Sequence, residues 1–402
     1  MTRSTLIFGI AITIAVSSPA GAVPVPPCDT LQNPIYLQVG DTQLNLMKRL
    51  GRALRDNTAK PITLVFVTSG SCVNIDNMYH RTAPITANMQ YVPSIAEDST
   101  WQPSSATLAC SPPTGGVFPD IANSALFNSA CTTETPPTNV KLTTGPTQAY
   151  VLAVPKASGA TAITFEEAYF LFGFGPLVLQ QMAGSITPWT DETQLFIRTS
   201  TKSTLLAWAA NISVPVSKWH GMAFDGSPMV VSALQGSTNP GAAIGILGAE
   251  VYDANRLSLT ALAFRANGQY AAYYPDSTST SRDKQNVRDG HYTVWSPTIW
   301  MNKVTGGSPD KPDTQYVIDL IAGKPVTPAP SFESSVIVAQ VGLVPDCAMR
   351  VKRSFEGGPL SLYKPSTSCV CKFMSSVDAT SCQNCTTTCA TGTCRDGYCE
   401  EF

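Results

Sequence analysis

Charge is scarce in this 402-residue chain, and so are the side chains from which most active sites are built. Asp, Glu, Lys and Arg make up 13% of the residues and give a net charge of -2, against about 25% charged residues in an average domain. No basic field for a nucleic acid is therefore present. The three histidines, His80, His220 and His291, show no metal-ligand spacing. There is also no Gly-x-Ser-x-Gly elbow and no His-Glu-x-x-His helix. We therefore expect no enzyme, no cofactor and no metal site.

Long apolar runs are also missing, except for one short run near the N-terminus. Arg3 is followed by an apolar stretch over residues 6–16 and then by the small residues Ala20-Gly21-Ala22. This pattern is typical of a secretory signal peptide. The run is roughly half of the 20 apolar residues that a membrane-spanning helix needs. We expect residues 1–22 to be removed on export to the periplasm or the cell surface, and the mature chain to have no membrane span.

Cysteine is absent from the middle of the chain and frequent elsewhere. The chain has 12 cysteines, none of them between Cys131 and Cys347 and eight of them from Cys347 to Cys399. An even number in an oxidising compartment favours disulfides. The tail from Cys369 onward has few large apolar residues, so disulfides must hold it together. Its spacing loosely resembles growth-factor-like or knottin-like repeats. Seven cysteines there need one outside partner, and Cys347 is the nearest candidate. Residues 346–402 are thus predicted to form a cysteine-rich module.

Short apolar runs alternate with helical patterns between about residues 43 and 323, which is typical of an α/β protein. Strands are predicted over 61–67, 149–154, 194–197, 243–247 and 257–264. Helices are predicted over 44–55, 164–173, 205–212, 227–234 and 314–322. The helix at Thr164 begins with a capping box that Glu167 completes. The polar stretch 275–290 is expected to be a long surface loop. Roughly 380 mature residues are more than one core usually supports, so two lobes are expected.

Several passages, in order along the chain, resemble the phosphate-binding proteins of ABC transporters. They are Val67-Thr68-Ser69-Gly70-Ser71, Phe196 to Thr204, Gly245-Ile246-Leu247-Gly248, and Val287 to Pro297. The resemblance covers roughly residues 30 to 330. It implies a type II periplasmic-binding-protein-like fold for residues 23–345, in which two α/β lobes enclose a ligand cleft. It also implies two crossings between the lobes, which we expect near 146–156 and 257–266.

The same resemblance implies an oxyanion site at two helix N-termini. Its expected ligand-binding residues are Thr68, Ser69 and Ser71 from one lobe and Arg198, Ser200 and Thr204 from the other. A helix N-terminus presents unpaired N–H groups and a partial positive charge, and arginine adds a planar charged fork that suits phosphate. The implied ligand is phosphate or a related small anion, held for uptake or sensing. The implied partner is an ABC transporter permease.

Three positions depart from the family pattern and bear on the ligand. Lys202 and Ser203 stand where the family has serine and glycine, so the glycine that allows close backbone approach is missing. Ala125 stands where the family has the acidic residue that accepts a proton from bound phosphate. Cys72 follows the first hydroxyl-rich turn, where a disulfide would stiffen it. We therefore expect a binding protein whose ligand has diverged.

One alternative stays open from the sequence. A cell-surface interaction protein could keep the same scaffold without a transport function, and the disulfide-rich tail favours this, because a small stapled module typically contacts other macromolecules. The tail could equally serve only to protect the C-terminus. No feature of the sequence separates these readings, since a fold does not fix a function.

Overall fold

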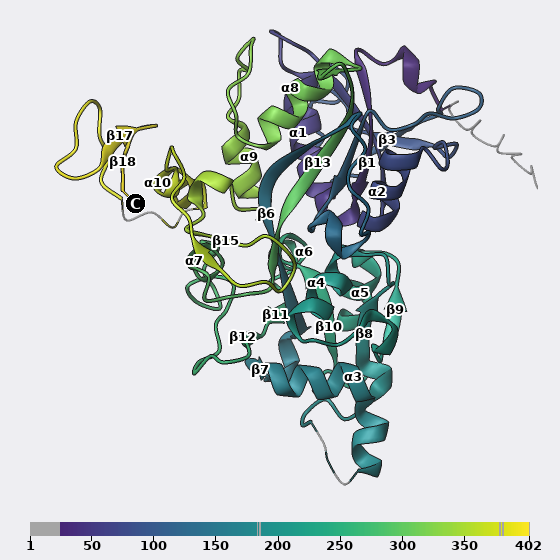
Figure 1. Ribbon diagram of the computed structural model, residues 1–402, viewed down its shortest axis with the longest axis vertical. Coiled ribbons are helices and arrows are strands. Elements are labelled where there is room, and N and C mark those ends of the chain that lie inside the picture. Colours follow the sequence, from purple (N-terminus) through teal and green to yellow (C-terminus); the bar gives the residue numbers. More distant parts are fainter. Residues whose placement is uncertain (1–24, 183, 185, 378, 380–381, 402) are drawn as a thin grey trace, which may run out of the picture.

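The computed structural model describes residues 25–182, 184, 186–377, 379 and 382–401, so the expected signal peptide lies outside the described residues. Among the residues described, no helix is long and apolar enough to cross a membrane. Two α/β lobes lie one above the other in Figure 1, with the C-terminal residues at one side. The predicted fold class, two α/β lobes with a disulfide-rich C-terminal region, is confirmed.

One sheet runs through both lobes. Lobe 1, the upper one in Figure 1, contributes β1 (Pro34–Gly40), β2 (Thr63–Ser69), β3 (Met89–Tyr91), β4 (Leu108–Cys110) and β5 (Ile121–Ser124). Lobe 2 contributes β8 (Leu195–Arg198), β9 (Met222–Phe224), β10 (Ile244–Gly248) and β11 (Leu259–Ala261). The two long strands between them are β6 (Val140–Pro155) and β13 (Trp295–Thr305), and β13 ends in a hairpin with β14 (Ser308–Pro309). The order is β4-β3-β2-β1-β5-β13-β6-β10-β8-β9.

The chain passes from lobe 1 to lobe 2 along β6. This strand pairs with β13 as far as Ala149 and with β10 from Tyr150 onward, and the change of partner lies inside the expected first crossing at 146–156. The second crossing does not lie near 257–266. That segment forms β11 and β12 (Ala263–Arg265), because its apolar residues pair within lobe 2 with the end of β6 and with a neighbouring short strand. The chain returns to lobe 1 along β13 instead.

Helices cover the sheet in each lobe. Lobe 1 has α1 (Leu44–Arg55), α2 (Ser71–His80), α8 (Pro312–Ile321) and α9 (Ser334–Gln340). Lobe 2 has α3 (Phe165–Gln181), α4 (Ser203–Asn211), α5 (Ser227–Gln235), α6 (Ala249–Ala254), α7 (Gln285–Asp289) and the short strand β7 (Ala162–Thr164), which pairs with β12. One hydrophobic core packs α1, α8 and α9 onto β1 and β2, and a larger one packs α3 to α6 onto β6, β8 and β10.

Helix α3 begins where the sequence predicts and is interrupted close to the predicted end. The Thr164 hydroxyl accepts the Glu167 N–H at 3.1 Å, and the Glu167 carboxylate accepts the Thr164 N–H at 2.8 Å, so the capping box is complete. The first helical segment breaks at Gly175, whose φ of 78° and ψ of 153° are not helical, close to the predicted end near Gly173. Glycine adopts this conformation without steric cost. A second helical segment, which the sequence did not predict, continues to Gln181.

The stretch 275–290 is expected to be a long surface loop, and its residues 277–280 and 282 are exposed, but buried ion pairs anchor it at both sides of this exposed part. Lys284 is fully buried, and its ammonium lies 2.8 Å from Asp253 and 3.0 Å from Asp276. Arg256 binds the same two carboxylates, each at 2.6 Å. Two cations facing two carboxylates leave no net buried charge, which makes such burial tolerable. The polar residues of this stretch therefore fix it to lobe 2.

All 12 cysteines pair, and no described cysteine is free. The six disulfides are Cys28–Cys110, Cys72–Cys131, Cys347–Cys369, Cys371–Cys382, Cys385–Cys394 and Cys389–Cys399. The first two lie in lobe 1 and the others in the C-terminal region, so the predicted partnership of Cys347 with the tail is confirmed. The C-terminal region contains β15 (Val351–Lys352), β16 (Ser361–Leu362), α10 (Val370–Ser376), β17 (Thr393–Arg395) and β18 (Tyr398–Glu400).

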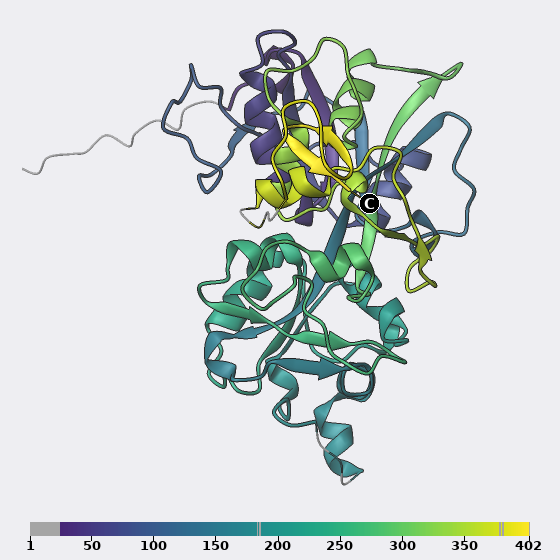
Figure 2. The ribbon, with the colours of Figure 1, turned by 90° about the vertical axis from the view of Figure 1, so that its left-hand side faces the viewer.

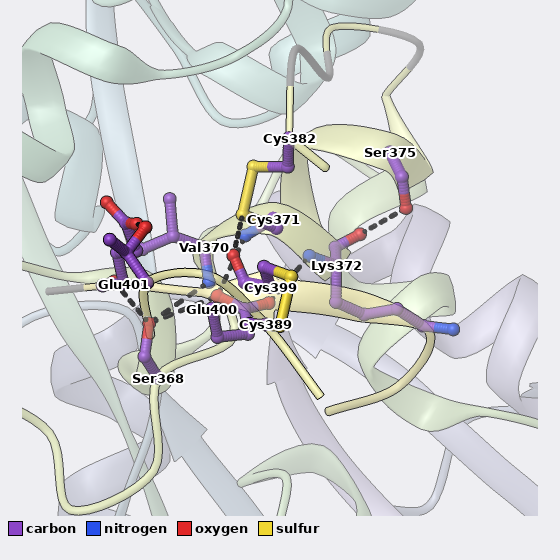
Figure 3. The surroundings of a disulfide bond; sticks show 11 residues. Ser368, Val370, Cys371, Lys372, Ser375, Cys382, Cys389, Cys399, Glu400 and Glu401 are labelled. Carbon is purple, nitrogen blue, oxygen red and sulfur yellow. Dashed lines mark hydrogen bonds between the residues drawn. A yellow bond between two sulfur atoms is a disulfide. The ribbon is translucent and has the colours of Figure 1, made fainter. Parts of the chain in front are cut away.

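The hairpin of β17 and β18 docks onto α10 through one carboxylate (Figure 3). Glu400 accepts the backbone N–H groups of Cys371 at 3.0 Å and Lys372 at 2.9 Å, at the first turn of α10. An anionic side chain is favourable at a helix N-terminus. Helix α10 in turn packs against α9, and Lys372 forms an ion pair with Glu333 of lobe 1 at 2.6 Å. Figure 2 shows α10 and the hairpin lying in front of lobe 1.

Candidate functional site between the lobes

The lobes touch at the two turns that the sequence predicts as the oxyanion site, and we call this region the lobe junction. The turn after β2 leads into α2, and the turn after β8 leads into α4. The Thr201 carbonyl of the second turn accepts the Cys72 N–H at 3.5 Å. A Cβ placed on Gly70 would lie 2.8 Å from the same carbonyl oxygen. The backbones of the two turns are therefore in direct contact.

Two of the predicted residues, Ser71 and Thr204, are buried at this contact. The Ser71 hydroxyl accepts the Ala125 N–H at 3.1 Å. The Tyr150 hydroxyl donates to the Ala125 carbonyl and is hydrogen-bonded to Ser203 at the start of α4. Burial raises the pKa of Tyr150 well above 10, so its phenol stays protonated. The Thr204 hydroxyl is buried with no hydrogen-bond partner among the described residues. Ser71 and Tyr150 thus both bind the backbone of Ala125, in the segment that follows β5.

Arg198 lies at the end of β8 and is fully buried. Its guanidinium donates to the carbonyls of Phe224 at 3.1 Å and Asp225 at 2.7 Å, and to the Ser227 hydroxyl at 2.5 Å. Its fourth bond, at 3.0 Å, reaches the Asp41 carboxylate of lobe 1. The same carboxylate oxygen accepts the Ser227 N–H, in the first turn of α5, at 2.9 Å. Asp41 is therefore held as an oxyanion would be, by a guanidinium and a helix N-terminus.

A pocket of about 550 Å³ opens beside the Asp41 carboxylate, between the start of α1, helix α5 and helix α6. Thr68 is exposed and lines this pocket. Lys202 also lines it, and its ammonium pairs with Asp225 at 3.0 Å. That lysine holds the pKa of Asp225 below its usual value. Lys202, which stands where the family has serine, thus lines the pocket as the cationic partner of Asp225.

The two remaining predicted residues lie near the junction without touching the pocket. Ser69 is half-buried at the end of β2, and Ser200 is exposed in the turn before α4. The structure therefore brings the six predicted residues to one region. Ser71 and Thr204 lie at the contact of the two turns, Arg198 is the buried guanidinium, and Thr68 lines the pocket. Ser69 and Ser200 take part in none of these three.

A loop from the C-terminal region also contacts the lobe junction, and the sequence did not predict it. Glu356 lies in this loop, and its carboxylate accepts the Phe127 N–H of lobe 1 at 3.0 Å and the Ser296 hydroxyl of β13. Burial raises the pKa of Glu356 above its usual value. Nearby, the Arg353 guanidinium lies over the ring of Trp295, 4.1 Å from its centre. Asp41 was also missed, although it follows an alternating apolar run and precedes an amphipathic helix.

A third polar contact joins the lobes beside β6. The Gln43 side chain of lobe 1 donates to the Gln148 side-chain oxygen at 3.1 Å, and the Gln148 amide donates to the Glu250 carboxyl group of α6. Glu250 is buried, and burial raises its pKa from 4.5 to about 8. This carboxyl group is therefore largely protonated at neutral pH.

Comparison with solved structures shows which fold this arrangement belongs to. The chain is similar to a protein from Clostridium perfringens described as a phosphate ABC transporter substrate-binding protein with bound phosphate. The two share 14% identity with a TM-score of 0.50, over 78% of this chain and 99% of that one. An ABC-type phosphate transport receptor from Vibrio cholerae matches with 11% identity and a TM-score of 0.47, over 78% of this chain and all of its own length, 100%.

The first of these similarities establishes the fold of the phosphate-binding proteins, as the sequence resemblance predicted. No protein-family model and no curated protein matches the chain. At 14% identity the shared fold does not identify the ligand, which depends on this chain's own residues.

Proposed function

We propose that this protein is an exported solute-binding protein that holds a small oxyanion against Arg198, at the pocket between the lobes. The observation that carries the proposal is the position of the Asp41 carboxylate. It occupies an anion site made of the Arg198 guanidinium and the Ser227 N–H, and it borders an open pocket. An external oxyanion has the same charge and accepts the same hydrogen bonds, so it can replace Asp41 when that side chain turns toward the pocket.

The pocket favours an oxyanion that carries an organic body. Its volume of about 550 Å³ is that of a site for a small molecule rather than for a bare ion. The Thr68 hydroxyl and the Lys202–Asp225 ion pair offer polar contacts on one side, and Leu44 and Met229 offer apolar ones. Small organic carboxylates and phosphate esters therefore fit this chain as well as inorganic phosphate does. Uptake or sensing through an ABC-type permease is the role that this fold and export together support.

Isothermal titration calorimetry of the mature protein tests the proposal. The panel contains phosphate, sulfate, small carboxylates and phosphate esters. Arg198→Ala should weaken binding by about 10- to 100-fold, because a hydrogen bond to a charged group contributes about 1.5–3 kcal/mol. Asp41→Asn should tighten binding, because it removes the competing charge. Arg265→Ala is the matched control, since that arginine pairs with Glu166 on the surface of lobe 2. Absence of any saturable heat across the panel would refute the proposal.

A second candidate is an interaction protein of the cell surface that uses the same scaffold without transport. One observation favours it. The C-terminal region contacts both lobes and presents a hairpin held by two disulfides, Cys385–Cys394 and Cys389–Cys399. This candidate would remain if the anion panel gave no binding.

A further inference from the structure

One short segment of the C-terminal region, residues 353–358, contacts both lobes at once. On the lobe 1 side, Glu356 accepts the Phe127 N–H at 3.0 Å. On the lobe 2 side, the backbone at Gly357 packs so closely on α4 that an added Cβ would lie 3.0 Å from the Ala210 carbonyl. The segment therefore joins the two lobes at a place outside the Asp41 pocket, whose lining includes none of its residues.

The carboxyl group of Glu356 is an integral part of this contact. It also accepts the Ser296 hydroxyl from β13, the strand along which the chain returns to lobe 1. Its second oxygen is buried with no hydrogen-bond partner among the described residues. If the lobes separated, the Phe127 N–H and the carboxyl group would move apart, and both would need new partners.

Other parts of the C-terminal region, helix α10 and Arg350, are fixed to the two lobes as well. Lys372 binds Glu333 of lobe 1 at 2.6 Å. The Arg288 guanidinium of α7, in lobe 2, lies 5.4 Å from the ring centre of Phe373. The Arg350 N–H, just before the segment, donates to the Arg288 carbonyl at 3.0 Å. The C-terminal region thus spans the junction from lobe 1 to lobe 2 and cannot follow either lobe alone.

We propose that residues 353–358 are a lock that holds the two lobes together in the closed arrangement, with Glu356 as its central contact. The lobes then do not hinge open around the junction. A solute would reach Arg198 through the preformed pocket, a consequence that rests on the proposed function. The lock itself does not depend on a ligand, so its test uses none.

Hydrogen–deuterium exchange of the full mature chain, with peptide-resolved mass spectrometry, tests the lock. The decisive amide is Cys72 N–H, which donates to Thr201 across the junction without touching Glu356. In Glu356→Ala it should exchange at least tenfold faster than in the wild type. Glu356→Gln should exchange at the wild-type rate, because its side-chain oxygen can still accept from Phe127 and Ser296. Glu166→Ala, on the exposed surface of lobe 2, is the control and should also behave as wild type.

The outcomes distinguish the loss of the Glu356 hydrogen bonds alone from a separation of the two lobes. Faster exchange at Cys72, with the strands of both lobe cores still protected, supports the lock. Unchanged exchange at Cys72 in Glu356→Ala overturns it, even if Phe127 exchanges faster. Should the alanine variant fail to fold, Glu356→Asp withdraws the carboxyl group by one methylene and is read in the same way. If no anion in the calorimetry panel bound, the result of the exchange experiment would still stand, because that experiment uses no ligand.

Discussion

The raised pKa of Glu250 predicts that stability falls as the pH rises. Glu250 is the buried carboxyl group that receives the Gln148 amide beside β6, and burial raises its pKa from 4.5 to about 8. Between these two values the folded protein holds a proton that the unfolded chain has released. Its contribution to stability is therefore complete below pH 4.5 and is lost as the pH rises through 8. The variant Glu250→Gln keeps the size of the side chain and its hydrogen bond but cannot ionise.

The magnitude follows from the two pKa values. From pH 6 to pH 9 the folded state gives up its proton near pH 8, so the wild type loses stability over roughly two pH units at about 1.36 kcal/mol each, which is about 3 kcal/mol. Glu250→Gln lacks this loss. Other titrating groups contribute equally to both proteins, so the difference between them isolates Glu250.

Urea denaturation under non-reducing conditions, at pH 6 and pH 9, measures this difference. The wild type should lose about 3 kcal/mol more than Glu250→Gln between the two pH values. Glu166→Gln, at a carboxylate on the surface of lobe 2, should follow the wild type. Parallel pH dependence of the wild type and Glu250→Gln would refute the assignment of a buried, protonated carboxyl group.

Two further predictions concern the lobe contact and the disulfides. Gly70→Ala should lower the free energy of unfolding by about 1–3 kcal/mol, as overpacking does, because the new Cβ would lie 2.8 Å from the Thr201 carbonyl while the backbone, with φ of -84°, accepts alanine. In Gly241→Ala the new Cβ would lie 3.8 Å from its nearest neighbouring atom, so the free energy of unfolding should change by less than about 0.5 kcal/mol. Equal effects at both glycines would contradict the close contact at Gly70. Alkylation of the unreduced, denatured protein should add no mass, because all 12 cysteines pair; several adducts would contradict this.

Local signals in the sequence predicted most of the elements. The amphipathic pattern over 44–55 matches α1, and the capping box at Thr164 is present in full. Helix α5 shows where local reasoning stops. Ser227 stands before Pro228, an order typical of a helix cap, yet its hydroxyl accepts from Arg198 and the helix begins with Gly226 in the cap position. A side chain that can cap a helix can also serve a distant guanidinium, and only the tertiary fold decides between them.

The candidate site was predictable in part. The turns after β2 and β8 resemble the family pattern, so Thr68, Ser71 and Arg198 were predicted. Asp41, the partner of Arg198, and the junction residue Glu356 were not, because the identity of a long-range partner leaves no local pattern. Glu356 is 229 residues from Phe127, whose N–H it accepts. A site between lobes thus depends on pairs of residues that are far apart in the sequence, and a local pattern can indicate one residue of a pair without identifying its partner.

The path of the chain through the two lobes bears on the order in which they can form. Lobe 2 is built from one uninterrupted stretch, residues 150–294, which contains no cysteine. Lobe 1 is split, because β5 pairs with β13, which is synthesised only after lobe 2. A chain that emerges N-terminus first can therefore complete lobe 2 while the first half of lobe 1 is still without that strand.

Unpaired strand edges invite association with other chains during this interval. The disulfides Cys28–Cys110 and Cys72–Cys131 both close within the early half of lobe 1. They can form before β13 has been made, and they then stabilise the first half of lobe 1 until β13 pairs with β5.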